Sequence, residues 1–240
     1  MNANWYHTSV EVSMGIAEGL ARIPLFKELP DDQLADLASI AVERPYARNA
    51  TIFSEGEPGA GFYVVLTGRV KIFKLSPDGK EQILHIFGPG EPFGEVPVFE
   101  GRAFPAHAEA LEKSTMLYFP RNAFVSLIKG NPSLALSMLA VLSRRLRTFT
   151  VLVDNLALKE VPGRLAAHLL YLSQLKQGTD NLELDISKGQ LASMLGTIPE
   201  TLSRILARLT KQGYIESGSR YIRILDRSAL EELAEGLRRL

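Results

Sequence analysis

The sequence contains no cysteine among its 240 residues, which excludes disulfide bonds, cysteine-ligated zinc and iron–sulfur clusters. It also contains no run of about 18 apolar residues that could cross a membrane. The start of the chain lacks the basic residues and apolar block of a secretory signal peptide. We therefore expect a soluble, cytoplasmic protein without a membrane partner.

The chain has no net charge, because 27 lysine and arginine side chains balance 27 aspartate and glutamate side chains. Any surface that binds nucleic acid must therefore be a local patch. The motifs G-x-S-x-G and H-E-x-x-H and the Walker lysine are missing, so we expect no enzymatic activity. The segment GPGEPFG at 88–94 differs in spacing from a dinucleotide-binding fingerprint, and we expect a turn between strands with no helix after it.

The region from Thr51 to Phe119 is predicted to form an antiparallel β-barrel or roll. Apolar and polar residues alternate in FYVVLTGRVKIFKL and EQILHIF, and glycines and the turn sequence PDG separate such runs. Upstream, residues 10–22 form a weak helical pattern, and residues 29–40 form a clearer one with Asp31 or Asp32 as N-cap. Together with the helices that follow the roll, this pattern predicts an α+β fold.

A long helix is predicted from about Ser133 to Leu158. Its apolar residues alternate in steps of four and three from Ala135 onward, which is the heptad pattern of a helix that pairs with another helix. The simpler alternative is a helix that packs on its own roll. The sustained period favours a parallel or near-parallel homodimer, whose seam would consist of Leu139, Leu142, Leu146, Phe149, Val153 and Leu156.

The last third of the chain is predicted to form a winged helix-turn-helix. VPGRLAAHLLYLSQLK is one helix, a second runs from its N-cap Ser187 to a stop at Gly196, and a third follows in TIPETLSRILARLTKQGYI. YIESGSRYIRIL supplies a β-hairpin, the wing. The expected domains are therefore 1–131 (roll with leading helices), 132–158 (the long pairing helix) and 159–240 (winged helix-turn-helix). The shared core of the two short helices would be Leu191, Leu195, Leu202, Ile205 and Leu206.

The third helix carries polar residues that can read DNA. Glu200, Ser203 and Arg204 share one face at its N-terminal end, which is the end that enters a major groove. Arg204 can contact guanine, Glu200 can accept from the cytosine amino group, and Ser203 and Thr201 can reach a thymine edge or a phosphate. The alternative is a solvated helix in which Glu200 and Arg204 form an ion pair. The surrounding segment favours DNA, because residues 187–225 carry two acidic residues against the basic Lys188, Arg204, Arg208, Lys211, Arg220 and Arg223.

The order of roll, long helix and winged helix-turn-helix resembles the CRP/FNR family of bacterial transcription regulators. The matching motifs are IFSEGEPGAGFYVVLTGRVKIFKLSPDGKEQIL, PFGE at 92–95, SRRL at 143–146 and PETLSRIL at 199–206. The resemblance implies that Glu200 and Arg204 read bases in a homodimer bound to palindromic DNA. Ser203 before Arg204 is similar to the FNR branch, whose half-sites are of the TTGA type, and RNA polymerase is an expected partner. The implied phosphate contacts are Ser187, Lys188, Thr201 and Arg220.

The sequence departs from the pattern of the cyclic-AMP receptors at their nucleotide site. Those receptors carry a Gly-Glu pair, present here as Gly94 and Glu95, and then an Arg-Ser pair that binds the cyclic phosphate. In this chain the second pair aligns with Phe104-Pro105, so the cation is missing and cyclic AMP is disfavoured. Arg102 lies close enough in the sequence to compensate, so cyclic AMP or another small metabolite stays an alternative. On the long helix, the adenine-facing threonine aligns with Phe149, and Thr150 follows it.

The inferred apolar lining of this pocket, Phe104, Pro105, Leu146 and Phe149, suits a planar hydrophobic cofactor such as haem. The chain also resembles the DNR and HcpR types, which respond to nitric oxide, so a response to nitric oxide or nitrosative stress is expected. An axial ligand would come from a histidine, a methionine or a tyrosine. His85 and His107 are the better candidates because they lie on predicted strands, whereas His7 and His168 do not. Zinc is disfavoured because the histidines show no short ligand spacing.

These features together predict effector-gated DNA binding. An effector between the roll and the long helix would change the packing near Phe149 and at residues 154–160. The two recognition helices of a dimer would then move into or out of register with successive major grooves, about 34 Å apart. The alternative from another class is a ligand-binding scaffold dimer whose winged helix contacts protein.

Overall fold

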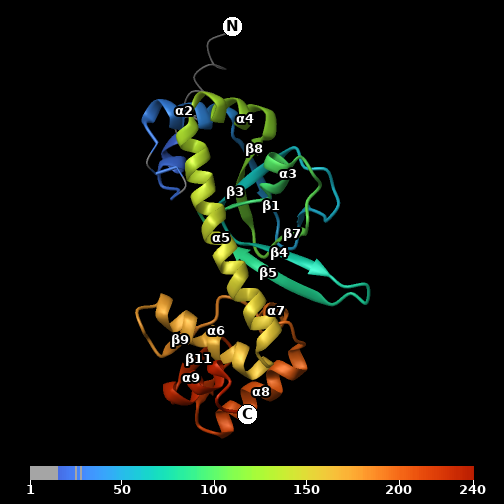
Figure 1. Cartoon of the computed structure of the whole chain (residues 1–240), viewed down its shortest axis with the longest axis vertical. Coiled ribbons are helices and arrows are strands. Elements are labelled where there is room, and N and C mark those ends of the chain that lie inside the picture. The colour runs from blue at the N-terminus through green and yellow to red at the C-terminus, as the bar shows by residue number, and fades with distance from the viewer. Residues whose placement is uncertain (1–15, 25, 28) are drawn as a thin grey trace. The chain divides into compact units, whose positions relative to one another are not determined.

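The described residues fold into two compact units, those up to 74 with 84–146 and residues 75–83 with 147–240 (Figure 1). The computed structural model describes residues 16–24, 26, 27 and 29–240. Residues 16–21 are helical, whereas the start of the helix expected at 10–22 and His7 lie outside the described residues.

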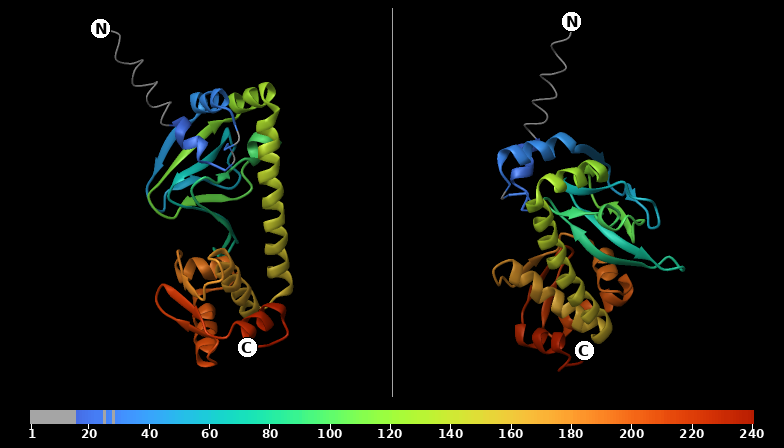
Figure 2. Two further views of the ribbon diagram at one scale, coloured as in Figure 1. Left: turned by 90° about the vertical axis from the view of Figure 1, so that its left-hand side faces the viewer. Right: turned by 45° about the horizontal axis from the view of Figure 1, so that its top comes forward.

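Two four-stranded antiparallel sheets form the roll and confirm its prediction; they belong to the first unit except for the part of one hairpin at 75–83 (Figure 2). One sheet has the order β1-β8-β3-β6, and the other has the order β2-β7-β4-β5. The strands of the first sheet are β1 (Val42–Tyr46), β8 (Ser114–Pro120), β3 (Gly61–Thr67) and β6 (Pro92–Phe93). Those of the second are β2 (Thr51–Phe53), β7 (His107–Ala110), β4 (Val70–Leu75) and β5 (Glu81–Phe87).

Strand β3 shows why the first sheet is apolar on both faces. Phe62 and Val64 belong to a buried cluster shared with helices, whereas Tyr63 and Val65 belong to a second cluster inside the roll. Successive residues of a strand point to opposite faces, so the continuous apolar run GFYVV satisfies both clusters.

Helices close one end of the roll (Figure 2). Helix α2 (Asp31–Ile40) packs against α4 (Arg121–Gly130), and the long helix α5 (Pro132–Leu158) follows. Two local expectations were wrong. The N-cap of α2 is Pro30, without a side-chain cap, because α2 already begins at Asp31. A short helix α3 (Val96–Glu100) does follow GPGEPFG, and it begins at the helix-compatible pair Val96-Pro97.

The second unit is a helical domain with a three-stranded sheet of order β10-β11-β9. The expected helices are α6 (Val161–Leu175), α7 (Lys188–Met194) and α8 (Pro199–Lys211), and the wing is the antiparallel pair β10 (Ile215–Ser217) and β11 (Tyr221–Ile224). Strand β9 (Asn181–Glu183) and helix α9 (Arg227–Glu235) complete the unit. The predicted shared core of α7 and α8 is buried in one cluster. The α+β fold with a helix-turn-helix is therefore confirmed.

Within the described part of the chain, no single helix is long and apolar enough to cross a membrane. Only α4 and α5 taken together meet the length and composition test, and a bend of 115° separates them.

Candidate nucleic-acid interface and effector site

The turn between α7 and α8 fixes the orientation of the two helices. Ser187 Oγ accepts from Gln190 N at 3.1 Å, and Gln190 Oε1 accepts from Ser187 N at 2.8 Å, so a capping box starts α7. Gly196 adopts φ +65°, a conformation that favours glycine, and Thr197 N donates to Ala192 O at 2.9 Å. This local geometry presents the N-terminal end of α8 at the surface.

The exposed face of α8 carries the residues predicted to read bases. Glu200, Ser203 and Arg204 are exposed, whereas Thr201 is half-buried. The Arg204 guanidinium donates to Thr201 Oγ1 at 3.2 Å, which orients it along this face. Among the described residues, the alternative ion pair between Glu200 and Arg204 is not formed. An acidic and a basic group therefore stand side by side without neutralising each other. The opposite face of α8 buries Leu202, Ile205, Leu206 and Leu209.

The wing carries one paired and one solvent-exposed arginine. Arg223 forms an ion pair with Glu216, and Tyr221 Oη donates to Glu216 Oε1 at 3.1 Å, so this carboxylate is used within the hairpin. Arg220 is exposed in the turn between β10 and β11. A Cβ at Gly218 would meet the Tyr221 ring at 2.1 Å, so the ring packs directly over this glycine.

In the described part of the chain, some cations of the second unit pair with carboxylates, and those of the helix-turn-helix do not. Arg227 and Arg238 have carboxylate partners, Asp180 at 2.6 Å and Glu232 at 2.7 Å. By contrast, no carboxylate of the described residues pairs with the cations of α7, α8 and the hairpin turn, which are Lys188, Arg204, Arg208, Lys211 and Arg220. Five cations without a described carboxylate partner are therefore gathered on the elements of the helix-turn-helix and its wing.

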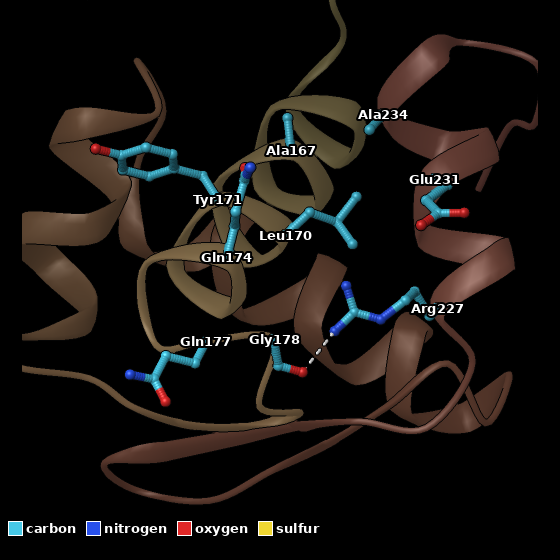
Figure 3. A pocket seen from close by; sticks show the side chains of 9 residues that line it. All are labelled: Ala167, Leu170, Tyr171, Gln174, Gln177, Gly178, Arg227, Glu231 and Ala234. Atoms are coloured by element: carbon cyan, nitrogen blue, oxygen red, sulfur yellow. Dashed lines mark hydrogen bonds between the residues drawn. The ribbon is translucent and has the colours of Figure 1, made fainter.

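A groove of about 620 Å³ lies between α6 and α9 (Figure 3). It contains none of the residues predicted to form a site. Its cation, Arg227, donates to Ser173 Oγ at 2.6 Å and to Gly178 O at 3.3 Å besides its pairing with Asp180. Its Nη2 makes all of these contacts, which ties the side chain to α6 and to the segment before β9.

In the first unit, the predicted effector residue Glu95 is held by an arginine of α5. The Glu95 side chain is 8% exposed and pairs with Arg145, which is 16% exposed. Arg145 also donates to Pro92 O, and its guanidinium carbon lies 4.8 Å from the centre of the Phe87 ring. Sequence reasoning missed this partnership. The two residues are 50 positions apart, so no local pattern pairs them.

The aromatic part of the predicted pocket is closed by stacking. Phe104 is buried, and its ring stacks on Phe53 with 3.7 Å between centroids and 7° between planes. Gly94 adopts φ +73°, and a Cβ there would lie 3.0 Å from Phe53 and 3.3 Å from Phe104. Pro105 is exposed, and its carbonyl accepts from Lys74 Nζ at 3.1 Å.

The compensating cation expected from the sequence lies elsewhere. Arg102 is 78% exposed at its side chain and pairs with Glu100 at 3.3 Å, not with Glu95. Phe149 and Thr150 belong to the second unit, so their place in an effector pocket stays a prediction.

The long helix leaves much of its predicted seam exposed. Leu134 and Met138 pack into the helix-covered cluster of the first unit, so the alternative of packing on the roll holds for the start of α5. Further along, Leu139 and Val153 are 57% and 64% exposed. Leu146 is also exposed, and Leu142, Phe149 and Leu156 are half-buried.

The two candidate haem ligands are engaged with neighbouring groups. His107 Nδ1 accepts from Glu55 N at 3.2 Å, its Nε2 lies 3.8 Å from Glu55 Oε2, and its ring stacks on Phe73. His85 Nε2 lies 3.8 Å from Glu91 Oε1. The backbone hydrogen bond to His107, the carboxylates beside both rings and the closed Phe53–Phe104 stack do not fit an open haem site. No cluster of three His, Cys, Asp or Glu that could hold a metal occurs among the described residues.

Comparison with known proteins finds similarity over nearly the whole chain. Residues 43–131 match the model of the Cyclic nucleotide-binding domain, and residues 163–233 match that of the Crp-like helix-turn-helix domain. The chain is 34% identical over 214 residues to the Cyclic AMP receptor protein of Thermus thermophilus, covering 89% of this chain and 98% of that protein. It is 31% identical over 221 residues to the CRP-like cAMP-activated global transcriptional regulator of Mycobacterium tuberculosis, covering 90% and 99%. The structure of FixK2 from Bradyrhizobium japonicum matches with a TM-score of 0.69 and 29% identity, covering 81% of this chain and 97% of that one.

Proposed function

Because the chain belongs to the CRP/FNR family of transcription regulators, we propose that it binds a palindromic TTGA-type site as a homodimer whose DNA affinity is set by an effector. Regulators of this family bind DNA and usually act as dimers. We propose that the roll at 1–131 senses the effector, the helix at 132–158 forms the dimer and the domain at 159–240 binds DNA. A chromosomal target implies a cytoplasmic location, and control of transcription implies contact with RNA polymerase.

One observation carries the DNA-binding proposal. Glu200 and Arg204 stand on the exposed N-terminal face of α8, and neither is neutralised by the other. Arg204 has the donors for guanine O6 and N7, and Glu200 has the acceptors for a cytosine amino group, so the pair can read a G·C base pair. Ser203 lies on the same face. Ser187, Lys188, Thr201 and Arg220 are the proposed phosphate contacts that set the register.

The homodimer proposal is supported by the exposed apolar residues of α5. Leu139, Leu146 and Val153 recur every seven residues and remain exposed in the single chain. Such a stripe is what a second copy of the same helix would cover. A two-fold dimer would place its recognition helices in successive major grooves about 34 Å apart, which requires an inverted repeat in the DNA.

For the effector, we propose a ligand other than cyclic AMP. Two regulators similar to this chain are named as cyclic-AMP proteins, so cyclic AMP remains the second candidate. The cations described near the pocket segment, Lys74, Arg102 and Arg145, are each paired with a carboxylate, which leaves a cyclic phosphate without a free partner. Calorimetric titration with cyclic AMP should give no saturable heat. A saturable heat would support the second candidate instead.

The expected response to nitric oxide through haem stays a prediction, and the contacts of His85 and His107 speak against it. Anaerobic titration with haem tests it. A saturating Soret band at one haem per subunit that shifts with nitric oxide would establish a haem sensor. A broad, non-saturating absorption would mean adventitious binding.

The experiment that tests the DNA-binding proposal compares Glu200→Ala/Arg204→Ala with the unchanged chain by fluorescence anisotropy on a TTGA palindrome and on a scrambled duplex. Each bidentate base contact contributes about 1–3 kcal/mol of discrimination, so the variant should bind both duplexes equally. Glu235→Ala/Arg239→Ala removes the same charges at the same spacing near α9 and should keep the preference. Unchanged preference in the α8 variant would refute the assignment. Failure of the unchanged chain to bind either duplex would favour a protein-binding scaffold.

A further inference from the structure

A groove of about 470 Å³ lies beside the second half of α8. Three elements form it: the start of α7, the solvent-facing side of α8 and the end of β10. Its floor is apolar and small, with Leu206 buried and Ala207 exposed. Its lining residues are Lys188, Ser203, Leu206, Ala207, Thr210, Lys211 and Ser217.

The lining is suited to an anion. It contains two ammonium groups and three hydroxyl groups, and no carboxylate lines it. Among the described residues, neither Lys188 nor Lys211 forms an ion pair. The groove between α6 and α9 differs on both points, because Glu231 lines it and Arg227 is bonded within the unit. Two uncompensated cations on one hollow attract a group that brings its own negative charge.

The position of the groove on α8 indicates what that group is. Lys211 follows Glu200 by 11 residues and Arg204 by seven, so the three side chains share one face of the helix. At 1.5 Å per residue, Lys211 lies about 16 Å along the axis from Glu200. The major groove is about 12 Å wide, so a residue this far from the base-reading end stands at the level of the sugar–phosphate backbone.

We propose that this groove holds a phosphate group of the DNA backbone, with Lys188 and Lys211 as its cations and the hydroxyls of Thr210 and Ser217 as further donors. The inference rests on the proposed function and adds Thr210, Lys211 and Ser217 to the DNA-contacting residues. A backbone contact at the far end of α8 fixes the tilt of the helix in the groove, because the N-terminal contacts alone leave the helix free to pivot.

The test is the salt dependence of DNA binding by the full chain with Lys211→Gln. Each lost phosphate contact should make the negative slope of log K against log salt less steep by about 0.9 per subunit. It should also lower the affinity by about fivefold per subunit near 0.15 M salt. The loss should be equal on the TTGA palindrome and the scrambled duplex. Lys129→Gln is the matched control, because Lys129 also sits in the last turn of a helix, α4, but outside the groove. It should change neither quantity.

A second variant keeps the inference falsifiable if Lys211→Gln loosens the end of α8. Ala207→Glu puts a carboxylate into the groove at an exposed helical position that accepts glutamate well. It should lower the affinity for both duplexes more than Lys211→Gln does. If the unchanged chain binds the palindrome but both variants match it in affinity and salt slope, the phosphate groove is refuted while the proposed function stands. A loss confined to the palindrome would make Lys211 a base-reading residue. Binding of inorganic phosphate by the DNA-free chain that Lys211→Gln abolishes, while the variant keeps the DNA affinity and salt slope of the unchanged chain, would assign the groove to a small anion and not to DNA. Both results would overturn the proposal.

Discussion

Replacement of Glu95 by glutamine should destabilise the roll through the arginine that it leaves behind. Arg145 is 16% exposed at its side chain and has Glu95 as its ion-pair partner. Glutamine keeps the size of the side chain and one oxygen acceptor but removes the negative charge. Arg145 would then keep its bond to Pro92 O and its position over the Phe87 ring while its own charge stays buried.

The magnitude follows from the surroundings of Arg145. Removal of one member of a buried ion pair costs about 3–5 kcal/mol, because the other charge remains uncompensated. Here Glu91 moderates the cost. Burial raises the pKa of Glu91, but hydrogen bonds from His85 and the Gly88 N–H and the charges of His85 and Arg145 outweigh it, so the pKa lies below its ordinary value. This carboxylate therefore stays charged within reach of Arg145. We therefore expect about 2–3 kcal/mol for Glu95→Gln, at the lower edge of the range.

Peptide-resolved hydrogen exchange measures this cost within the roll, where the slowest amides of β3 and β8 report its unfolding. A cost of about 2–3 kcal/mol corresponds to roughly 30- to 150-fold faster exchange. The double variant Glu95→Gln/Arg145→Met removes both charges and should cost less than the sum of the single variants by about 2 kcal/mol. Additive single costs would refute the reasoning, since they would mean that the two side chains do not stabilise each other.

Two further predictions concern the second unit. Burial lowers the pKa of His168 to about 4 from an ordinary 6.5. The unfolded chain therefore binds the proton first as pH falls, and the unit should lose up to about 3 kcal/mol of stability between pH 6.5 and 4. Denaturant titrations across this range should show the loss in the unchanged chain and a smaller change of unfolding free energy with pH in His168→Gln. The same pH dependence in both proteins would contradict the role of His168. On α5, Val153→Glu should convert the dimer to monomer in sedimentation experiments. Val151→Glu should leave it dimeric, because Val151 is similarly exposed, 56% against 64%, but lies on the opposite side of the helix. A monomer in both variants, or in neither, would refute the seam.

Local patterns made most of the fold predictable. The alternation in the strands, the capping residue Ser187, the glycine at 196 and the apolar period of α8 each act over a few residues, so the sequence shows them directly. Strand β9 was not anticipated because three residues, Asn181–Glu183, give no usable period.

The site was less predictable because it depends on contacts between distant residues. The exposed face of α8 follows from helical spacing, but the partnership of Arg145 with Glu95 spans 50 positions. Arg102 looked suitable by its place in the sequence, yet it pairs with its neighbour Glu100 in solvent. The stack of Phe104 on Phe53 likewise joins residues that are far apart in the sequence.

In that stack, each ring occupies the surface of the other that an effector would contact. Phe104 is buried against Phe53, so an effector that contacts either ring must first separate them. The free energy of this opening is subtracted from the intrinsic affinity, and the observed dissociation constant rises by the inverse of the open fraction. A screen of unchanged protein at low ligand concentration would therefore overlook effectors that fit well. Phe104→Ala removes the ring that stacks on Phe53, so no stack has to open before a ligand binds. The compounds that bind this variant would indicate the shape of the natural effector.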